Sequence, residues 1–168
     1  MTSDLLLRPI VAADDTEISA LHARVFCPGR FARTAYRVRE GTLFASPFCR
    51  AIVDADGRII AAIRYTAITI GGQPGALLLG PLAVDAAHAN QGHGRRLMAA
   101  GADLARGAGQ RLIVLVGNAP YYGRLGYETI PFGQITLPGP VDPARLLALE
   151  LVPGARAEFS GSIAAAAE

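Results

Sequence analysis

Residues 79–98, LGPLAVDAAHANQGHGRRLM, carry an apolar stretch, then a loop with two glycines, then the start of a helical pattern. Gly92 and Gly94 stand directly before Arg95 and Arg96. The first N–H groups of a helix lack partners within it, and glycine allows close approach, so several of them can converge on a phosphate. A tight turn that merely needs two glycines explains the same residues. The surrounding sequence decides between the two.

Predicted strands stand on both sides of this loop and its helix. Residues 76–85 are mostly apolar, and residues 111–116, RLIVLV, are almost continuously so, which is typical of a buried parallel strand. Pro81 has no N–H for a β-ladder, so it indicates a sheet edge, a bulge or an interruption of pairing. Strand, loop, helix and strand make a βαβ unit. The helix, over residues 95–109, is predicted to bury one face formed by Leu97, Gly101, Leu104 and Ala108.

The rest of the chain predicts further strands and helices. Asp56-Gly57, inside the alternating residues 48–70, is a strong hairpin signal and predicts two antiparallel strands. A turn at residues 71–75 then leads into the strand that carries Pro81. Residues 118–130 are expected to form a short aromatic helix or turn and then a strand. Other strands are expected at residues 5–10, 144–152 and 157–163, with a frayed end after them. Helices are expected at residues 14–26, with an apolar stripe of Ile18, Leu21 and Val25, and at residues 32–40, with Arg33, Arg37 and Arg39.

Length and composition fit one globular domain over residues 1–168, since 51% of the residues are hydrophobic and 18% are charged. The net charge of +2 gives no general attraction to nucleic acid or to an anionic membrane, although every basic residue is an arginine. Cys27 and Cys49 make neither a disulfide framework nor a zinc pattern, and no metal site is expected. No apolar segment reaches membrane-spanning length, so we expect a cytoplasmic enzyme or binding domain.

Two nucleotide-binding patterns fail at the glycine loop. A dinucleotide fingerprint needs a third glycine where Leu97 stands and an acidic residue after the next strand, which instead runs into Gly117-Asn118. A P-loop needs a lysine, and the chain has none. A nucleotide-binding oxidoreductase is therefore disfavoured.

Residues 79–98 followed by LIVLVGNAPYYGRLGY, residues 112–127, resemble the GCN5-related N-acetyltransferase (GNAT) superfamily. They are most similar to its bacterial YhbS-like branch, whose members carry a Y-Y-x-x-x-G-F/Y segment. The resemblance covers residues 77–130 strongly and the rest in element order. It implies an α/β (α+β) fold, with a mixed, twisted, mostly antiparallel central sheet, a splayed parallel pair of strands, and flanking helices.

The activity that the resemblance implies is transfer of an acetyl group from acetyl-coenzyme A directly to a primary amine. The acceptor is expected to be a small molecule, a peptide or a protein, and homodimers are frequent among such domains. In the family, the loop motif R/Q-x-x-G-x-G/A binds the cofactor's pyrophosphate, and here it falls on residues 89–94. Ala89 replaces the usual arginine or glutamine, and Gln91 is a candidate to supply the polar group.

The resemblance also implies how the rest of the cofactor is held. The pantetheine arm is expected to pair with the main chain of Leu82 and Val84, like an added strand, where the two central strands splay apart. Asn118 is expected either to bond to the arm or to cap the following turn. The implied cofactor-binding residues are Leu82, Ala83, Val84, Asn90, Gln91, Gly92, His93, Gly94, Arg95 and Asn118.

Acetyl transfer needs an unprotonated amine, a polarised carbonyl and a proton for the departing thiolate. Tyr122, four residues before Gly126, matches the family tyrosine that gives this proton, and a phenol of pKa ~10 can protonate a thiolate of pKa ~8.5 in a dry site. A tyrosine beside glycines is also common as a plain core residue. A strand N–H near Val84 is expected to polarise the carbonyl.

The general base is not evident, because residues 76–80, ALLLG, contain no glutamate. The candidates are water relayed to Asp85, His88 or a backbone carbonyl, with His22 and His93 weaker. The acceptor is expected over the first two helices, where Arg30, Phe31 and Arg33 are candidates to bind it and arginines suit a carboxylate or phosphate. Ala89 and the missing glutamate leave an alternative, a non-catalytic sensor module that binds coenzyme A or its acyl form.

Overall fold

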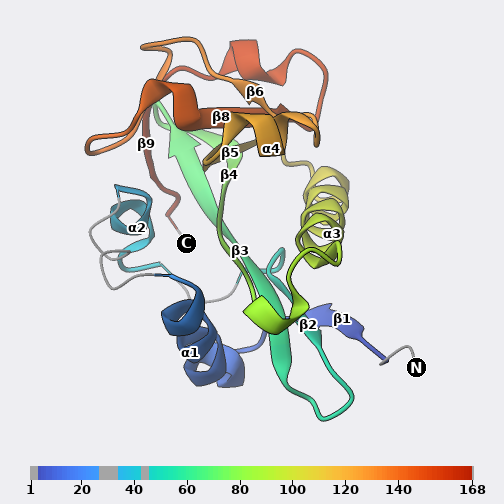
Figure 1. Cartoon of the computed structure of the whole chain (residues 1–168). Coiled ribbons are helices and arrows are strands. Elements are labelled where there is room, and N and C mark those ends of the chain that lie inside the picture. The colour runs from blue at the N-terminus through green and yellow to red at the C-terminus, as the bar shows by residue number, and fades with distance from the viewer. Residues whose placement is uncertain (1–3, 27–33, 43–45, 168) are drawn as a thin grey trace.

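The computed structural model describes residues 4–26, 34–42 and 46–167. Its strands form one open, twisted sheet in the order β1-β2-β3-β4-β5-β8-β6, with β9 beside β3 and β7 beside β9 (Figure 1). The strands are β1 (Leu6–Pro9), β2 (Arg50–Val53), β3 (Ile59–Ile70), β4 (Gln73–Val84), β5 (Leu112–Val116), β6 (Glu128–Thr129), β7 (Ile135–Thr136), β8 (Leu146–Glu150) and β9 (Gly161–Ala165). The helices are α1 (Asp15–Val25), α2 (Thr34–Arg39), α3 (His93–Gly107) and α4 (Ala119–Gly123), with 3-10 turns η1 (Ala12–Asp14), η3 (Ala86–His88), η4 (Pro143–Arg145) and η5 (Ala155–Glu158).

Helices cover both faces of the sheet, with α1 on one side and α3 on the other (Figure 1). Alternate residues of β2 and β3 point to opposite faces, as the two-residue period of a strand requires. Ile52 and Ile63 therefore pack with α3, whereas Ala51 and Ala62 pack with α1. In the part of the chain that the structure describes, no helix has the length and apolarity needed to cross a membrane.

The two central strands, β4 and β5, are parallel but pair over only three residues. Ala76, Leu77 and Leu78 pair with residues 112–114, and the pairing ends there. Beyond that point β4 stays with β3 and β5 stays with β8, so the two strands part. The predicted fold, a mostly antiparallel sheet with a splayed parallel pair and flanking helices, is confirmed.

Pro81 lies at a β-bulge. Tyr65 of β3 pairs with Leu79, but Ile63 pairs with Leu82, so β4 has one more residue than β3 across this stretch. Of the three interpretations that the sequence left open for Pro81, two are confirmed: the bulge against β3 and the interruption of pairing, since β4 and β5 no longer pair after Leu78. Pro81 stands just where β4 leaves β5.

Several predicted elements differ in detail from the structure. The α3 face is wrong in part, because Leu104 is 38% exposed and Ala108 follows the helix, while the buried residues are His93, Leu97, Met98, Gly101 and Ala105. Val25 is exposed, so the stripe of α1 is Ile18 and Leu21 alone. Strand β4 begins within the predicted turn, at Gln73. The predicted frayed end is partly strand, since β9 runs to Ala165 and pairs with β3, and β7 was not predicted.

Candidate active site

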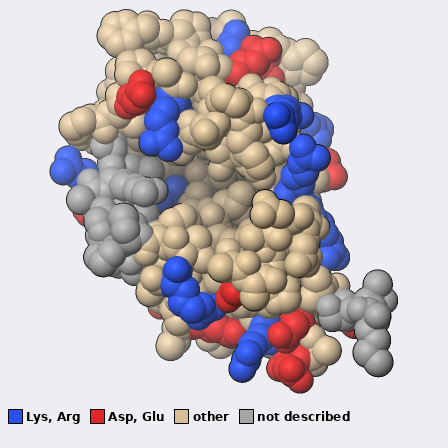
Figure 2. Space-filling model, viewed as in Figure 1, with Lys and Arg blue, Asp and Glu red and all other residues tan. Residues whose placement is uncertain are grey.

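A cleft of about 620 Å³ opens where β4 and β5 part. Figure 2 shows the molecule hollowed at this place, with mostly uncharged side chains around the opening. One wall is β4 at residues 79–82, and the opposite wall is the end of β5 with the start of α4. Residues 140–142 and Arg145, from the segment before β8, complete the lining together with Phe26 and Arg39.

Past Leu78, the main chain of β4 turns toward this open side groups that pair with no other strand among the described residues. The N–H of Asp85 donates to the carbonyl of Ile60 on β3 at 2.8 Å. Because backbone N–H and C=O groups alternate in direction along a strand, those of Ala83 also point toward β3, whereas those of Leu82 and Val84 point away from it. Leu82 lines the cleft, while Ala83 is 1% exposed and its side chain packs under α1. The edge of β4 beside the cleft is therefore available for a further partner.

The glycine loop has the geometry of an anion cradle. Asn90 and Gly92 both have positive φ, 60° and 85°, which turns the chain sharply into α3. Gly92 is the N-cap, and no side chain caps the helix. Among the described residues, no acceptor meets the N–H groups of residues 91–95. These N–H groups lie at the positive end of the helix dipole and are open to an anion.

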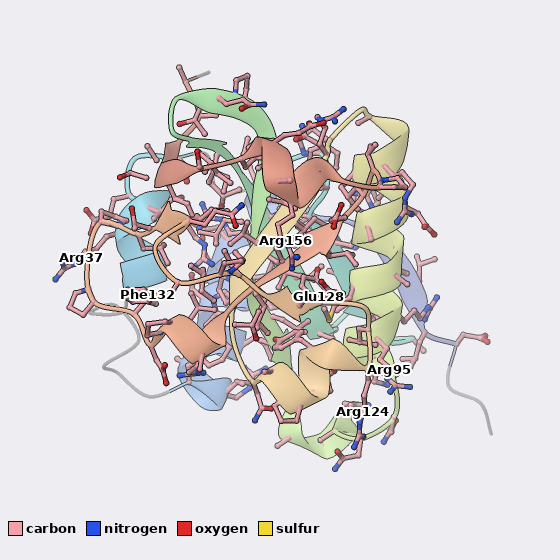
Figure 3. All side chains as sticks on the ribbon, turned by 90° about the horizontal axis from the view of Figure 1, so that it is seen from above. Arg37, Arg95, Arg124, Glu128, Phe132 and Arg156 are labelled. Atoms are coloured by element: carbon pink, nitrogen blue, oxygen red, sulfur yellow. The ribbon has the colours of Figure 1, made fainter. Side chains whose placement is uncertain are left out.

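The loop adjoins the cleft. A Cβ placed on Gly94 would lie 3.5 Å from the hydroxyl oxygen of Tyr121 and 3.6 Å from Cδ2 of Leu82, both of which line the cleft. Arg95 is exposed and points outward, as does Arg124 after α4 (Figure 3). A single ligand could therefore place a phosphate on the loop and extend from it along the edge of β4.

His93 differs from its neighbours in the loop because its side chain is only 8% exposed. Its Nε2 lies 3.3 Å from Oε1 of Gln91. Burial lowers the pKa of His93, and the nearby His88 and Arg96 lower it further. The neutral imidazole packs in the loop, so only the backbone N–H of His93 is offered to an anion.

Tyr122 lines the cleft, and its ring packs against Gly117, where any larger residue would collide with it. A Cβ on Gly117 would collide with its ring, and the ring also makes edge contacts with Tyr121 and Tyr127 at centroid distances of 4.9 and 5.8 Å. Burial raises the pKa of Tyr122 above its usual value, with Tyr121 adding to the rise and Arg145 opposing it. The phenol therefore stays protonated at neutral pH and is suited to donate a proton.

Asn118 lies at the edge of the cleft and caps α4. Its Oδ1 accepts from the N–H of Tyr121 at 3.2 Å. The cap that the sequence left open as an alternative is therefore present. The amide nitrogen of the side chain is still available to a ligand.

None of the predicted general bases lines the cleft. Asp85 accepts from the N–H of Ala87 at 3.1 Å and pairs with Arg24 at 3.1 Å. The first of these contacts is the main reason that the pKa of Asp85 is lowered, which makes it a weak base. The rings of His88 and His93 lie 6.2 Å apart in the loop. Within the described residues, Asp142 is the carboxylate of the lining, and it caps η4 by accepting from Ala144.

The predicted acceptor residues Arg30, Phe31 and Arg33 lie outside the described residues. The structure adds Arg39, Arg145 and residues 140–142 to the cleft. Arg39 belongs to a helix that the sequence predicted, but its periodicity does not say which arginine is turned inward. In the described residues, no group of three or more His, Cys, Asp or Glu side chains is placed to hold a metal ion.

A model of the acetyltransferase (GNAT) family matches residues 17–127. The chain is 26% identical over 125 residues to a protein of Escherichia coli K12 named "Uncharacterized N-acetyltransferase YhbS", and the match covers 74% of each chain.

Two solved structures share the fold. The E. coli GNAT family N-acetyltransferase YhbS in complex with CoA has a TM-score of 0.84 and 23% identity, covering 99% of this chain and 92% of that one. A GNAT family acetyltransferase from Brucella melitensis in complex with acetyl-CoA has a TM-score of 0.71 and 23% identity, covering 98% of this chain and 97% of that one.

Proposed function

Because the chain belongs to the acetyltransferase (GNAT) family, we propose that the cleft between β4 and β5 is the active site of an acetyl-CoA-dependent N-acetyltransferase. The observation that carries the proposal is the continuity of two unsatisfied backbone surfaces. The N–H groups of residues 91–95 open to an anion, and the free edge of β4 lies directly beside them. The relatives solved with CoA and acetyl-CoA have this same fold.

The cofactor's pyrophosphate is assigned to the N–H groups of residues 91–95. The two positive-φ residues Asn90 and Gly92 shape this loop, and Arg95 adds charge at its rim. The pantetheine arm is assigned to the edge of β4, where the peptide groups of Leu82 and Val84 can pair with its amides as a further strand would. Ala83 lies between them in the strand and is assigned no contact with the cofactor, because its backbone groups point toward β3. The amide nitrogen of Asn118 is assigned to the opposite side of the arm.

The reaction is a direct transfer. The neutral amine attacks the thioester carbonyl carbon, so a C–N bond forms, the C–S bond breaks, and the amine gives up a proton to water. A strand N–H near Val84 is assigned to the developing oxyanion. Tyr122 donates its phenolic proton to the departing thiolate and is reprotonated from solvent. A dry, packed position for the ring favours this role because its hydroxyl is neutral at working pH.

The acceptor is assigned to the end of the cleft near α1 and α2, and is a primary amine of a small molecule or peptide. Arg30, Phe31 and Arg33 are proposed to contact it. We also propose that residues 1–168 form one domain and that it acts in the cytoplasm, where a thiol such as Cys49 stays reduced. Pairing of two copies is proposed as well, and light scattering would test it.

The test is acetyl-CoA binding by two matched glycine variants. Gly92 and Gly154 both have φ near +85°, at 85° and 83°, and a Cβ at either meets nothing within 4 Å. Gly92→Ala and Gly154→Ala should lose similar stability, because both put a Cβ in the left-handed region. Only Gly92→Ala should also raise the calorimetric Kd for acetyl-CoA, by about 10-fold or more, since it disturbs the phosphate loop.

The wild-type protein should also be heat-stabilised by millimolar acetyl-CoA. No stabilisation of the wild type, or equal Kd values for the two variants, would contradict the assignment of the loop.

A coenzyme A sensor without catalysis is the second candidate. Ala89 in the loop favours it, and so does the position of Asp85, His88, His22 and His93, none of which is among the described residues that line the cleft. The two candidates differ in product, because an enzyme acetylates members of an amine panel while a sensor binds acetyl-CoA and leaves every amine unchanged. Mass spectrometry of the panel separates them.

A further inference from the structure

Arg39, the last residue of α2, is a charged residue that is 6% exposed and yet lines the cleft. Its guanidinium lies against the bulge of β4, because a Cβ on Gly80 would come 2.9 Å from its Nη2. Glycine is needed at position 80 for two reasons: its φ is +123°, and a Cβ would obstruct the arginine. Arg37, on the same helix, is exposed and points outward (Figure 3).

The cleft is cationic on balance. Its described lining has two guanidinium groups, on Arg39 and Arg145, and one carboxylate, Asp142. That carboxylate already accepts from the N–H of Ala144 at 3.0 Å. The other lining residues are uncharged, and Phe26, Leu79 and Val141 give the cleft an apolar side.

A buried guanidinium is costly unless an anion or several acceptors meet it. Arg39 has interactions within the chain, and five N–H donors in a planar fork are enough to serve protein groups and a ligand together. Carboxylate and phosphate both match this fork in two parallel bonds. The two guanidinium groups and one carboxylate of the described lining leave one net positive charge, which matches the single negative charge of a carboxylate. A cationic amine such as a polyamine would instead meet repulsion at this end of the cleft.

We propose that the acceptor is an amine that also carries a carboxylate, and that Arg39 binds this carboxylate while the amine faces the thioester. The proposal rests on the acetyltransferase function proposed above. Arg39 is then a specificity-determining residue, and the apolar side of the cleft receives the acceptor's own apolar part. Arg145, at the opposite wall, adds to the positive potential.

The first experiment compares matched amines on the wild-type protein. Each set contains an amino acid or dipeptide, its carboxamide, the amine without the carboxyl group, and, as separate members, phosphoethanolamine and spermidine. Acetylated product is measured by mass spectrometry with saturating acetyl-CoA. Carboxylates should exceed their carboxamides by at least about 10-fold in kcat/KM, since the carboxamide loses the charge-assisted pair.

Calorimetry with acetyl-CoA separates failure of this inference from failure of the proposed function. If acetyl-CoA does not bind, the function itself fails. If it binds and carboxamides, spermidine or phosphoethanolamine are preferred, only the carboxylate assignment is overturned. If it binds and no amine is acetylated, the catalytic function fails as well and the sensor function remains.

The second experiment uses Arg39→Gln with Arg37→Gln as its matched control. Arg39→Gln should raise the KM of the preferred carboxylate acceptor by at least about 10-fold, with the KM of acetyl-CoA unchanged, and should erase the preference over the carboxamide. Arg39→Lys should recover part of it, because the charge returns without the planar fork. Arg37→Gln should behave as wild type. An unchanged acceptor KM in folded Arg39→Gln would overturn the role of Arg39, and the wild-type panel decides on the carboxylate even if that variant fails to fold.

Discussion

Tyr122 is positioned by packing. Its ring lies on Gly117 and against two other tyrosine rings, and in the part of the chain that the structure describes no group is hydrogen-bonded to its hydroxyl. The hydroxyl is therefore held near the cleft with its donor capacity unused. The residue type and the spacing to Gly126 are visible in the sequence, but the support from Gly117 is visible only in the fold.

Tyr122→Phe should lower kcat on the order of 10²-fold and leave the KM of acetyl-CoA nearly unchanged, because only the proton donor is lost. Burial raises the pKa of Tyr122, so the donor form is present at all pH values below the ordinary tyrosine value of ~10. The wild-type kcat should accordingly show no descending limb up to about pH 10. Tyr127→Phe, in the same ring cluster but away from the cleft lining, is the control and should keep the wild-type rate.

A wild-type rate in Tyr122→Phe would remove the acid role. A fall in wild-type kcat well below pH 10 would place another acid at the thiolate.

The packing of α3 on the sheet depends on one glycine. A Cβ at Gly101 would collide with the ring of Tyr65, a residue 1% exposed whose hydroxyl donates to the carbonyl of Met98 at 3.4 Å. Burial raises the pKa of Tyr65 well above its usual value. The helix can lie close to the sheet here only because Gly101 leaves room for this aromatic ring.

Gly101→Ala should destabilise the protein by about 1–3 kcal/mol, since the cost of overpacking exceeds the gain in helix propensity. Gly107→Ala, near the end of the same helix, meets open space and should be neutral or stabilising by up to about 1 kcal/mol. Urea denaturation of both variants measures the difference. Equal stability of the two would mean that the helix shifts freely over Tyr65.

Local signals in the sequence predict the hairpin, the glycine loop and the βαβ unit, because each is decided by residues close together in the chain. The face that α3 buries is not predicted in this way, since Leu104 and Ala105 both continue a helical stripe. Packing on the sheet decides between them, and it buries Ala105 and leaves Leu104 exposed. The same holds for the end of β9. The strand predicted at residues 157–163 includes Gly161–Ile163, but Ala164 and Ala165 carry no pattern and extend it only beside β3. The burial of Arg39 likewise depends on Gly80, far away in sequence.

At the scale of the whole molecule, an ion pair fixes the first strand to the turn before α1. Arg8 donates to both carboxylate oxygens of Asp14, at 2.8 and 2.9 Å, and Asp14 is 7% exposed. The Arg8 hydrogen bond lowers the pKa of Asp14, and the N–H of Val11 lowers it as well. The folded chain thus holds the carboxylate in its ionised form more strongly than the unfolded chain does.

Because this pKa is lower in the folded chain, the pair's contribution is complete above the unfolded value of ~4 and is lost as pH falls below it. Asp14→Asn should lower the free energy of unfolding at pH 7 by about 1–3 kcal/mol and flatten its decline in acid. Asp103→Asn, which removes an exposed pair with Arg106, should change little. Thermal unfolding between pH 3 and 7 tests both, and parallel acid declines in wild type and Asp14→Asn would refute the linkage.

Strands β3 and β4 each span twelve residues and run through both halves of the molecule, past the place where β5 turns away. This continuous antiparallel pair of strands forms the centre of the fold. The cleft between β4 and β5 is bounded by the pair and not by a linker. The slot is therefore preformed, and most of the entropy lost on association falls on the long, flexible ligand. Fragments of that ligand that are held rigid in an extended conformation should therefore gain disproportionately in affinity.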